Sequence, residues 1–141
     1  MKIQWLGHAC FLLVSDGGVR VLTDPFDPKV GYPTPAVAAD IVTASHQHSD
    51  HNYTKAVQGE FTFIEKPVET TVRGIAIKGI PSFHDDAQGS QRGQNILFSF
   101  TIDGLNVVAT RYRGGKLHAV VAIPAGAEKK QYQVTVTTGA G

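Results

Sequence analysis

The sequence predicts a single strand-rich domain, and three observations lead to this prediction. The chain has 141 residues, which is the length of one ordinary domain. Hydrophobic residues make up 42% and charged residues 18%, which is enough apolar material for a core and too little charge for a disordered chain. Short apolar runs of β type, separated by turn residues, recur along the whole chain, whereas only two short segments favour helix.

Each strand is predicted from an apolar or alternating run between turn signals, such as the Asp-Gly pairs at 16–17 and 103–104. We expect strands at 3–6, 9–14, 19–23, 40–44, 61–64, 70–72, 75–80, 96–102, 105–109, 117–123 and 132–137. Residues 24–39 are interrupted by several prolines and are predicted to form a surface loop. Helix is expected only at 53–58 and 127–131.

Composition excludes several classes of protein. The formal net charge of +1 gives no electrostatic footprint for nucleic acid, and the basic residues Arg111, Arg113 and Lys116 are read as a solvated loop. A single cysteine, Cys10, excludes an internal disulfide framework. No apolar run approaches the roughly 18 residues that span a bilayer, and the first residues do not resemble a signal peptide. We therefore expect a cytoplasmic protein without a membrane or nucleic-acid partner.

The strongest chemical signal is the run His46-x-His48-x-Asp50-His51. Imidazole nitrogens and carboxylate oxygens are good ligands for zinc and similar divalent metals. Residues two apart in an extended segment point the same way, so His46 and His48 can reach one metal together. The alternative interpretation is a group of solvated surface histidines.

His84 follows the predicted strand 75–80, beside Asp85 and Asp86. A third histidine from a separate strand end would complete a three-histidine set with an open position for water, as in catalytic zinc sites. The alternative is a loop histidine that is capped by its neighbouring aspartates.

These residues resemble a known family. The run HQHSDH is similar to the HxHxDH signature of the metallo-β-lactamase superfamily. Its context is MKIQWLGHACFLL, VRVLTDPF, DIVTASHQHSDHN, IPSFHDD and GQNILFSFTIDGLNVV, in that order. Together they resemble the branch of small metal-dependent hydrolases that includes the ascorbate-6-phosphate lactonase-like proteins. The resemblance implies an α/β fold, an αββα sandwich, of which this chain would hold mainly the N-terminal half. We expect a single domain over 1–141, in which 1–108 matches the family and 109–141 diverges.

The resemblance also implies roles for the site residues. His46, His48 and His84 would bind a first metal, and Asp50 and His51 would begin a second site. Asp24 would support the ligand loop from behind the ligands. His8 matches a residue near the pocket, for which we expect a place in the core or behind the ligands.

Two features of the family pattern are missing from the sequence. The resemblance implies a bridging aspartate after 105–108 and a late histidine, but no Asp or Glu lies between Gly104 and Ala127. His118 could replace the missing histidine, but it stands inside an apolar run, which is typical of a packed strand. Glu128 beside two lysines is typical of a solvated charge. Three explanations stay open: a short variant with one metal, a remnant whose C-terminal region was replaced, or a second chain that supplies surface and ligands. The third predicts a homo-oligomer that covers an exposed apolar sheet.

We therefore expect a hydrolase, of full or weakened activity, in which metal-activated water attacks an ester, lactone or phosphoester of a small-molecule substrate. Asp50 would accept the proton of that water. Zinc is the expected metal, with one ion or two per chain, and manganese or iron would suit the same ligands. The alternative is a non-catalytic metal-binding or assembly module that descends from such a hydrolase.

Overall fold

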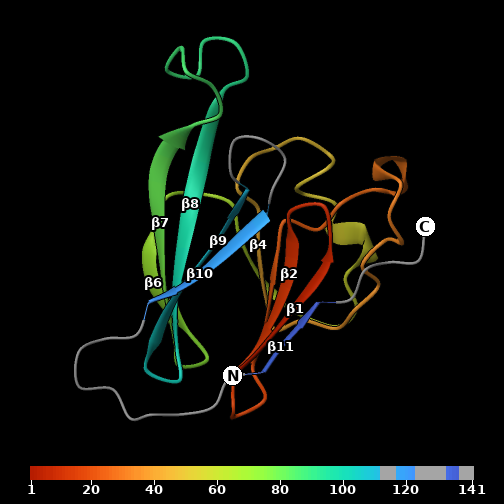
Figure 1. The fold of residues 1–141 in the computed structure, drawn as a ribbon, viewed down its shortest axis with the longest axis vertical. Helices are drawn as coiled ribbons and strands as arrows, with labels where there is room; N and C mark the ends of the chain where they lie inside the picture. Colours follow the sequence, from red (N-terminus) through yellow and green to blue (C-terminus); the bar gives the residue numbers. More distant parts are fainter. Residues whose placement is uncertain (112–116, 123–132, 137–141) are drawn as a thin grey trace.

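The computed structural model describes residues 1–111, 117–122 and 133–136, which form two β-sheets. The six-stranded sheet has the order β11-β1-β2-β3-β4-β5, and the five-stranded sheet has the order β10-β9-β8-β7-β6 (Figure 1). The strands of the first sheet are β1 (Lys2–Gly7), β2 (Cys10–Val14), β3 (Arg20–Thr23), β4 (Ile41–Thr43), β5 (Thr62–Ile64) and β11 (Gln133–Val136). Those of the second are β6 (Glu69–Val72), β7 (Ile75–Phe83), β8 (Gln94–Ile102), β9 (Leu105–Arg111) and β10 (Leu117–Ala122).

The strand predictions are confirmed, and the differences lie at strand ends. β7 continues through Pro81 to Phe83 instead of ending at residue 80. Proline lacks the N–H that a central strand needs, so Pro81 inside β7 requires a structural reason. In the structure β6 pairs with β7 only as far as Lys78, so Pro81 is paired on one side only, with Ile96 of β8. Proline is tolerated in such an edge segment.

The helix prediction at 53–58 was wrong in type and extent. That segment holds a single 3-10 turn, Thr54–Ala56, and the loop 24–39 holds another, Pro28–Val30. These are the helical elements of the described residues, and neither is long and apolar enough to cross a membrane. A six-residue segment can close too few i→i+4 hydrogen bonds to repay helix nucleation. The helix expected at 127–131 lies outside the described residues.

The main core lies between the two sheets. Alternate residues of each strand point inward, and large side chains with less than 2% exposure come from both sheets. They include Leu13 and Ile41 from the first sheet and Ile77 and Phe100 from the second. Each such burial stabilises the fold by about 1.5–3 kcal/mol before the entropy of ordering is counted. The two sheets therefore cover each other's apolar faces, which confirms a strand-rich, incomplete sandwich.

A second core covers the other face of the six-stranded sheet. Leu22 and Val42 alternate with residues of the main core and pack with Cys10 and Phe26, all at 0% exposure. Phe26 belongs to the loop 24–39, so this loop supplies a cover for the sheet over the strand ends. Burial raises the pKa of the Cys10 thiol well above its usual value, and the thiol is free. Cys10 is thus a packing residue.

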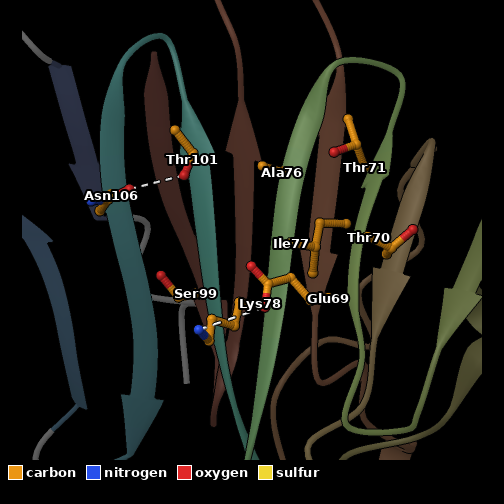
Figure 2. Close-up of a pocket in the computed structure, with 9 residues that line it drawn as sticks. All are labelled: Glu69, Thr70, Thr71, Ala76, Ile77, Lys78, Ser99, Thr101 and Asn106. Atoms are coloured by element: carbon orange, nitrogen blue, oxygen red, sulfur yellow. Dashed lines mark hydrogen bonds and ion pairs between the residues drawn. The ribbon is translucent and has the colours of Figure 1, made fainter.

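The outer face of the five-stranded sheet is mostly polar. It carries an open hollow of about 400 Å³ over β6, β7, β8 and β9 (Figure 2). Thr101 donates a 2.9 Å hydrogen bond to Asn106, and Lys78 lies 3.6 Å from Glu69. None of the described residues that line this hollow belongs to the histidine cluster.

Candidate metal centre

The predicted site residues come together at one edge of the sandwich because they follow strand ends. His8 comes directly after β1, Asp24 directly after β3, and His84 directly after β7. The run 46–51 begins three residues after β4. β3 and β4 are parallel neighbours, so the residues that follow them leave the sheet at the same edge. Side chains at such an edge are well placed to converge on a ligand.

The first group consists of His46, His48 and His84, whose ligand-capable atoms all lie within 4.8 Å of one another. The rings of His46 and His84 are 4.4 Å apart, and those of His46 and His48 are 4.9 Å apart. His46 Nε2 and His84 Nδ1 are buried and have no hydrogen-bond partner. A buried polar atom without a hydrogen-bond partner lowers the stability of the fold by about 1–3 kcal/mol. A bound cation would supply a partner to both nitrogens.

Burial is the main cause that lowers the pKa of His46 to about 4, and the neighbouring His51 and His84 lower it further. A neutral imidazole offers a nitrogen lone pair to a metal, whereas a protonated one does not. The environment of His46 therefore keeps it in the state that a metal ligand requires. The interpretation of this cluster as solvated surface histidines does not fit these contacts.

The second group consists of His8, Asp50 and His51, whose ligand-capable atoms also lie within 4.8 Å of one another. A tight turn brings Asp50 and His51 to this position, because the N–H of His51 donates a 2.8 Å hydrogen bond to the carbonyl of His48. Burial alone would raise the pKa of Asp50, but His51 and His8 outweigh it and hold that pKa below its usual value. Asp50 is therefore ionised at neutral pH.

Asp24 and Ser45 lie behind the histidines. Asp24 Oδ1 accepts a 2.7 Å hydrogen bond from the N–H of Ser45 and lies 3.5 Å from His51 Nδ1. Ser45 Oγ lies 3.0 Å from His46 Nδ1 and 3.5 Å from His51 Nδ1. Contacts of this kind orient imidazole ligands and select the nitrogen that faces the metal. The Ser45 carbonyl accepts a hydrogen bond from Ile96 of β8, which ties the ligand loop to the second sheet.

The loop after His84 is organised by Asp85. Its carboxylate accepts four hydrogen bonds of 2.7–3.2 Å from the N–H groups of Ala87, Gly89, Gln91 and Arg92. Desolvation is the largest single effect and would raise the pKa of Asp85, but the four hydrogen bonds together outweigh it and lower that pKa. The alternative in which neighbouring aspartates cap His84 does not hold for Asp85, since its oxygens bind the loop backbone.

All seven predicted residues thus meet at one site, and their individual roles remain predictions. Ser45 was not singled out in the sequence, although its place directly before the first histidine was a usable signal. The sequence predicts His8 in the core or behind the ligands. In the structure its ring contacts Asp50 and His51 directly. The side chains of His118 and Arg111, and Arg113, Lys116 and Glu128 as a whole, lie outside the described residues.

Comparisons with known proteins agree with this geometry. A family model for the beta-lactamase superfamily domain matches residues 2–133. A UPF0173 metal-dependent hydrolase of Methanoculleus marisnigri is 31% identical over 130 residues, which covers 76% of this chain and 56% of that protein. A protein of the same description from Methanobrevibacter smithii is 41% identical over 54 residues, 36% of this chain and 23% of that protein.

A solved structure from Thermotoga maritima, assigned to the Zn-dependent hydrolases of the metallo-beta-lactamase superfamily, shares 44% sequence identity with a TM-score of 0.59. The match covers 75% of this chain and 46% of that one. The longer of these matches therefore span about half of the length of the relatives, 56% and 46%.

Proposed function

The chain belongs to the beta-lactamase superfamily domain family, and from this premise we propose that it carries the metal site of a hydrolase that cleaves esters, lactones or phosphoesters with activated water. One observation carries the proposal. His46 Nε2 and His84 Nδ1 are buried without a hydrogen-bond partner, in a group where His48 adds a third ligand atom. Three convergent imidazoles of this kind suit a divalent cation and leave an open position for water.

His46, His48 and His84 would hold the cation, and zinc is the metal that we propose because it favours imidazole ligands. A divalent cation held there would lower the pKa of water and polarise the carbonyl or phosphoryl oxygen. The ionised Asp50 carboxylate would take up the proton of the attacking water. Ser45 and Asp24 would keep the histidine rings in place during the reaction.

The proposal is tested by metal content and turnover of the 141-residue chain purified without chelator. We expect bound zinc by elemental analysis, and hydrolysis of a generic phosphodiester or lactone. His46→Ala and His84→Gln should remove both the metal of the three-histidine group and the turnover. Lys78→Ala is the control, because Lys78 lies on the polar outer face, and it should change neither. Protein without any bound metal would refute the proposal.

A non-catalytic metal-binding module is the second candidate. It is favoured by one observation, the lack of any Asp or Glu between Gly104 and Ala127, where the resemblance implies a bridging carboxylate. Stoichiometric metal with no hydrolysis of either substrate class would support this module over the enzyme.

Self-association through an exposed sheet stays a prediction. The apolar inner faces cover each other, so for a second copy we propose the outer face of the five-stranded sheet, where Ile80 and Val120 are 43% and 55% exposed. The mass in solution decides this, since a monomer at working concentration contradicts the predicted homo-oligomer.

A further inference from the structure

We propose that His8 is a direct ligand of the second divalent-cation position, which the resemblance implies for Asp50 and His51. This proposal rests on the proposed function, because it adds a metal beside the three-histidine group. His8 Nε2 lies 3.1 Å from Asp50 Oδ2 and 3.2 Å from His51 Nε2, and the latter two atoms are 3.6 Å apart. Three ligand atoms from two distant segments thus form one small triangle.

The size of this triangle fits a metal. With metal–ligand distances of about 2.0–2.2 Å, tetrahedral coordination separates neighbouring ligand atoms by about 3.3–3.6 Å. The three observed separations lie at or slightly below this range. A cation could therefore bind with little movement of the side chains.

The other ring nitrogen of His51 has the partners that a ligand needs. His51 Nδ1 lies 3.5 Å from both Asp24 Oδ1 and Ser45 Oγ. A carboxylate at the far nitrogen fixes the tautomer and raises the basicity of a metal-binding histidine. His51 Nε2 is thereby directed to His8 and Asp50.

The backbone at the end of β1 is shaped to present His8. His8 has a φ of +48°, in the left-handed region that non-glycine residues rarely adopt. A register shift between Trp5 and Gly7 bends the strand end, and Trp5 Nε1 donates a 3.0 Å hydrogen bond to the His8 carbonyl. Such local strain persists where the surroundings enforce it, and it concentrates at functional sites.

Gly7 makes this turn possible. Its φ is +118°, and a Cβ at this position would lie 2.8 Å from Cγ of Tyr32. The ring of Tyr32 also packs against Trp5, with centroids 5.7 Å apart. The strand end is therefore closed in by the loop 24–39, which leaves the His8 ring directed at the ligand loop.

The competing explanation is that His8 only hydrogen-bonds to Asp50. Zinc titration of the complete chain by calorimetry separates the two. We expect two zinc ions for the unchanged protein and one for His8→Gln, which keeps a hydrogen-bonding group but is a poor ligand. The remaining ion should bind His8→Gln with an affinity within about threefold of the original. The counterpart His84→Gln should lose the other ion.

Two further measurements protect the test from a folding defect. His8→Asn is titrated in parallel, because asparagine tolerates left-handed backbone better than other side chains. In the unchanged protein, nitrogen NMR should show the Nε2 resonance of His8 shifting when the second equivalent of zinc is added. The proposal is overturned if both His8 variants bind two ions, or if the unchanged protein binds one ion and the His8 resonance stays fixed. In the latter case the proposed function survives, whereas protein that binds no zinc refutes both.

Discussion

The carboxylate of Asp24 accepts a 2.7 Å hydrogen bond from the N–H of Ser45, which joins the end of β3 to the residue before His46. Asp24 itself has a φ of +43°, a conformation that Asn also tolerates. We expect Asp24→Ala to weaken zinc binding about 10- to 100-fold, as loss of a group behind metal ligands typically does. Asp24→Asn keeps an acceptor for Ser45 and should lose less. Competition with a chromogenic chelator measures both affinities, and equal losses would show that the charge, not the hydrogen bond, matters.

Ser45 offers one hydroxyl to two histidines, 3.0 Å from His46 Nδ1 and 3.5 Å from His51 Nδ1. Ser45→Ala should therefore lower zinc affinity by about tenfold without unfolding the sheets. Ser45→Thr keeps the hydroxyl and serves as the rescue variant. An unchanged affinity in Ser45→Ala, measured by the same chelator competition, would contradict a role in ring orientation.

Asp40 predicts an acid dependence of stability. The N–H of Arg20 in β3 donates to its carboxylate, and Arg73, between β6 and β7, lies 3.3 Å away, so Asp40 links the two sheets. The hydrogen bond from the Arg20 backbone is the main cause that lowers the pKa of Asp40 below 3.8. A lowered pKa in the folded state stabilises the fold above the unfolded value, and this stabilisation is lost as the pH falls through the folded value.

Urea unfolding at several pH values tests this dependence. At pH 7 Asp40→Asn should be less stable than the unchanged protein by about 1 kcal/mol. The difference should shrink as the pH falls below 3.8, the ordinary value for the carboxyl group. A difference that does not change with pH would exclude ionised Asp40 as its source.

Asp85 should control the order of the loop that follows His84. Its carboxylate accepts hydrogen bonds from four backbone N–H groups, so Asp85→Ala leaves them without this partner. We expect hydrogen exchange at Ala87, Gly89, Gln91 and Arg92 to accelerate by at least about tenfold. Asp86→Asn is the matched control, because it alters the neighbouring carboxyl group. Equal acceleration in both variants would show that the loop responds to any loss of charge there.

Most strands could be predicted from the sequence because their signals are local. The run 96–102 alternates and ends at an Asp-Gly pair, and the structure places β8 at Gln94–Ile102. The start of β8 was missed by two residues, because Gln94 and Asn95 have no β preference and pair only through Phe83 and Ser82 of β7. Tertiary pairing decided that boundary.

The residues of the candidate site could be predicted from the sequence, but most of their contacts could not. Six positions from His46 to His51 hold four metal-capable residues, which is a local pattern. The contact of His8 with Asp50 depends on a bend at Gly7 and on Tyr32 far along the chain. Asp85 accepts hydrogen bonds from backbone N–H groups, which every residue except proline has, so the residue types do not predict these contacts. Such relationships exist only once the chain is folded.

The pairing of β11 with β1 has a consequence for synthesis of the protein. Ile3 lies in register with Val134, so β1 receives this neighbour only after about 130 further residues have been made. At typical translation rates this delay is on the order of 10 s. During that time β1 is an open edge whose unpaired N–H and C=O groups can bind another nascent chain. The free edge of β1 (residues 2–7) is therefore a place where the nascent chain can associate with another chain until β11 is made.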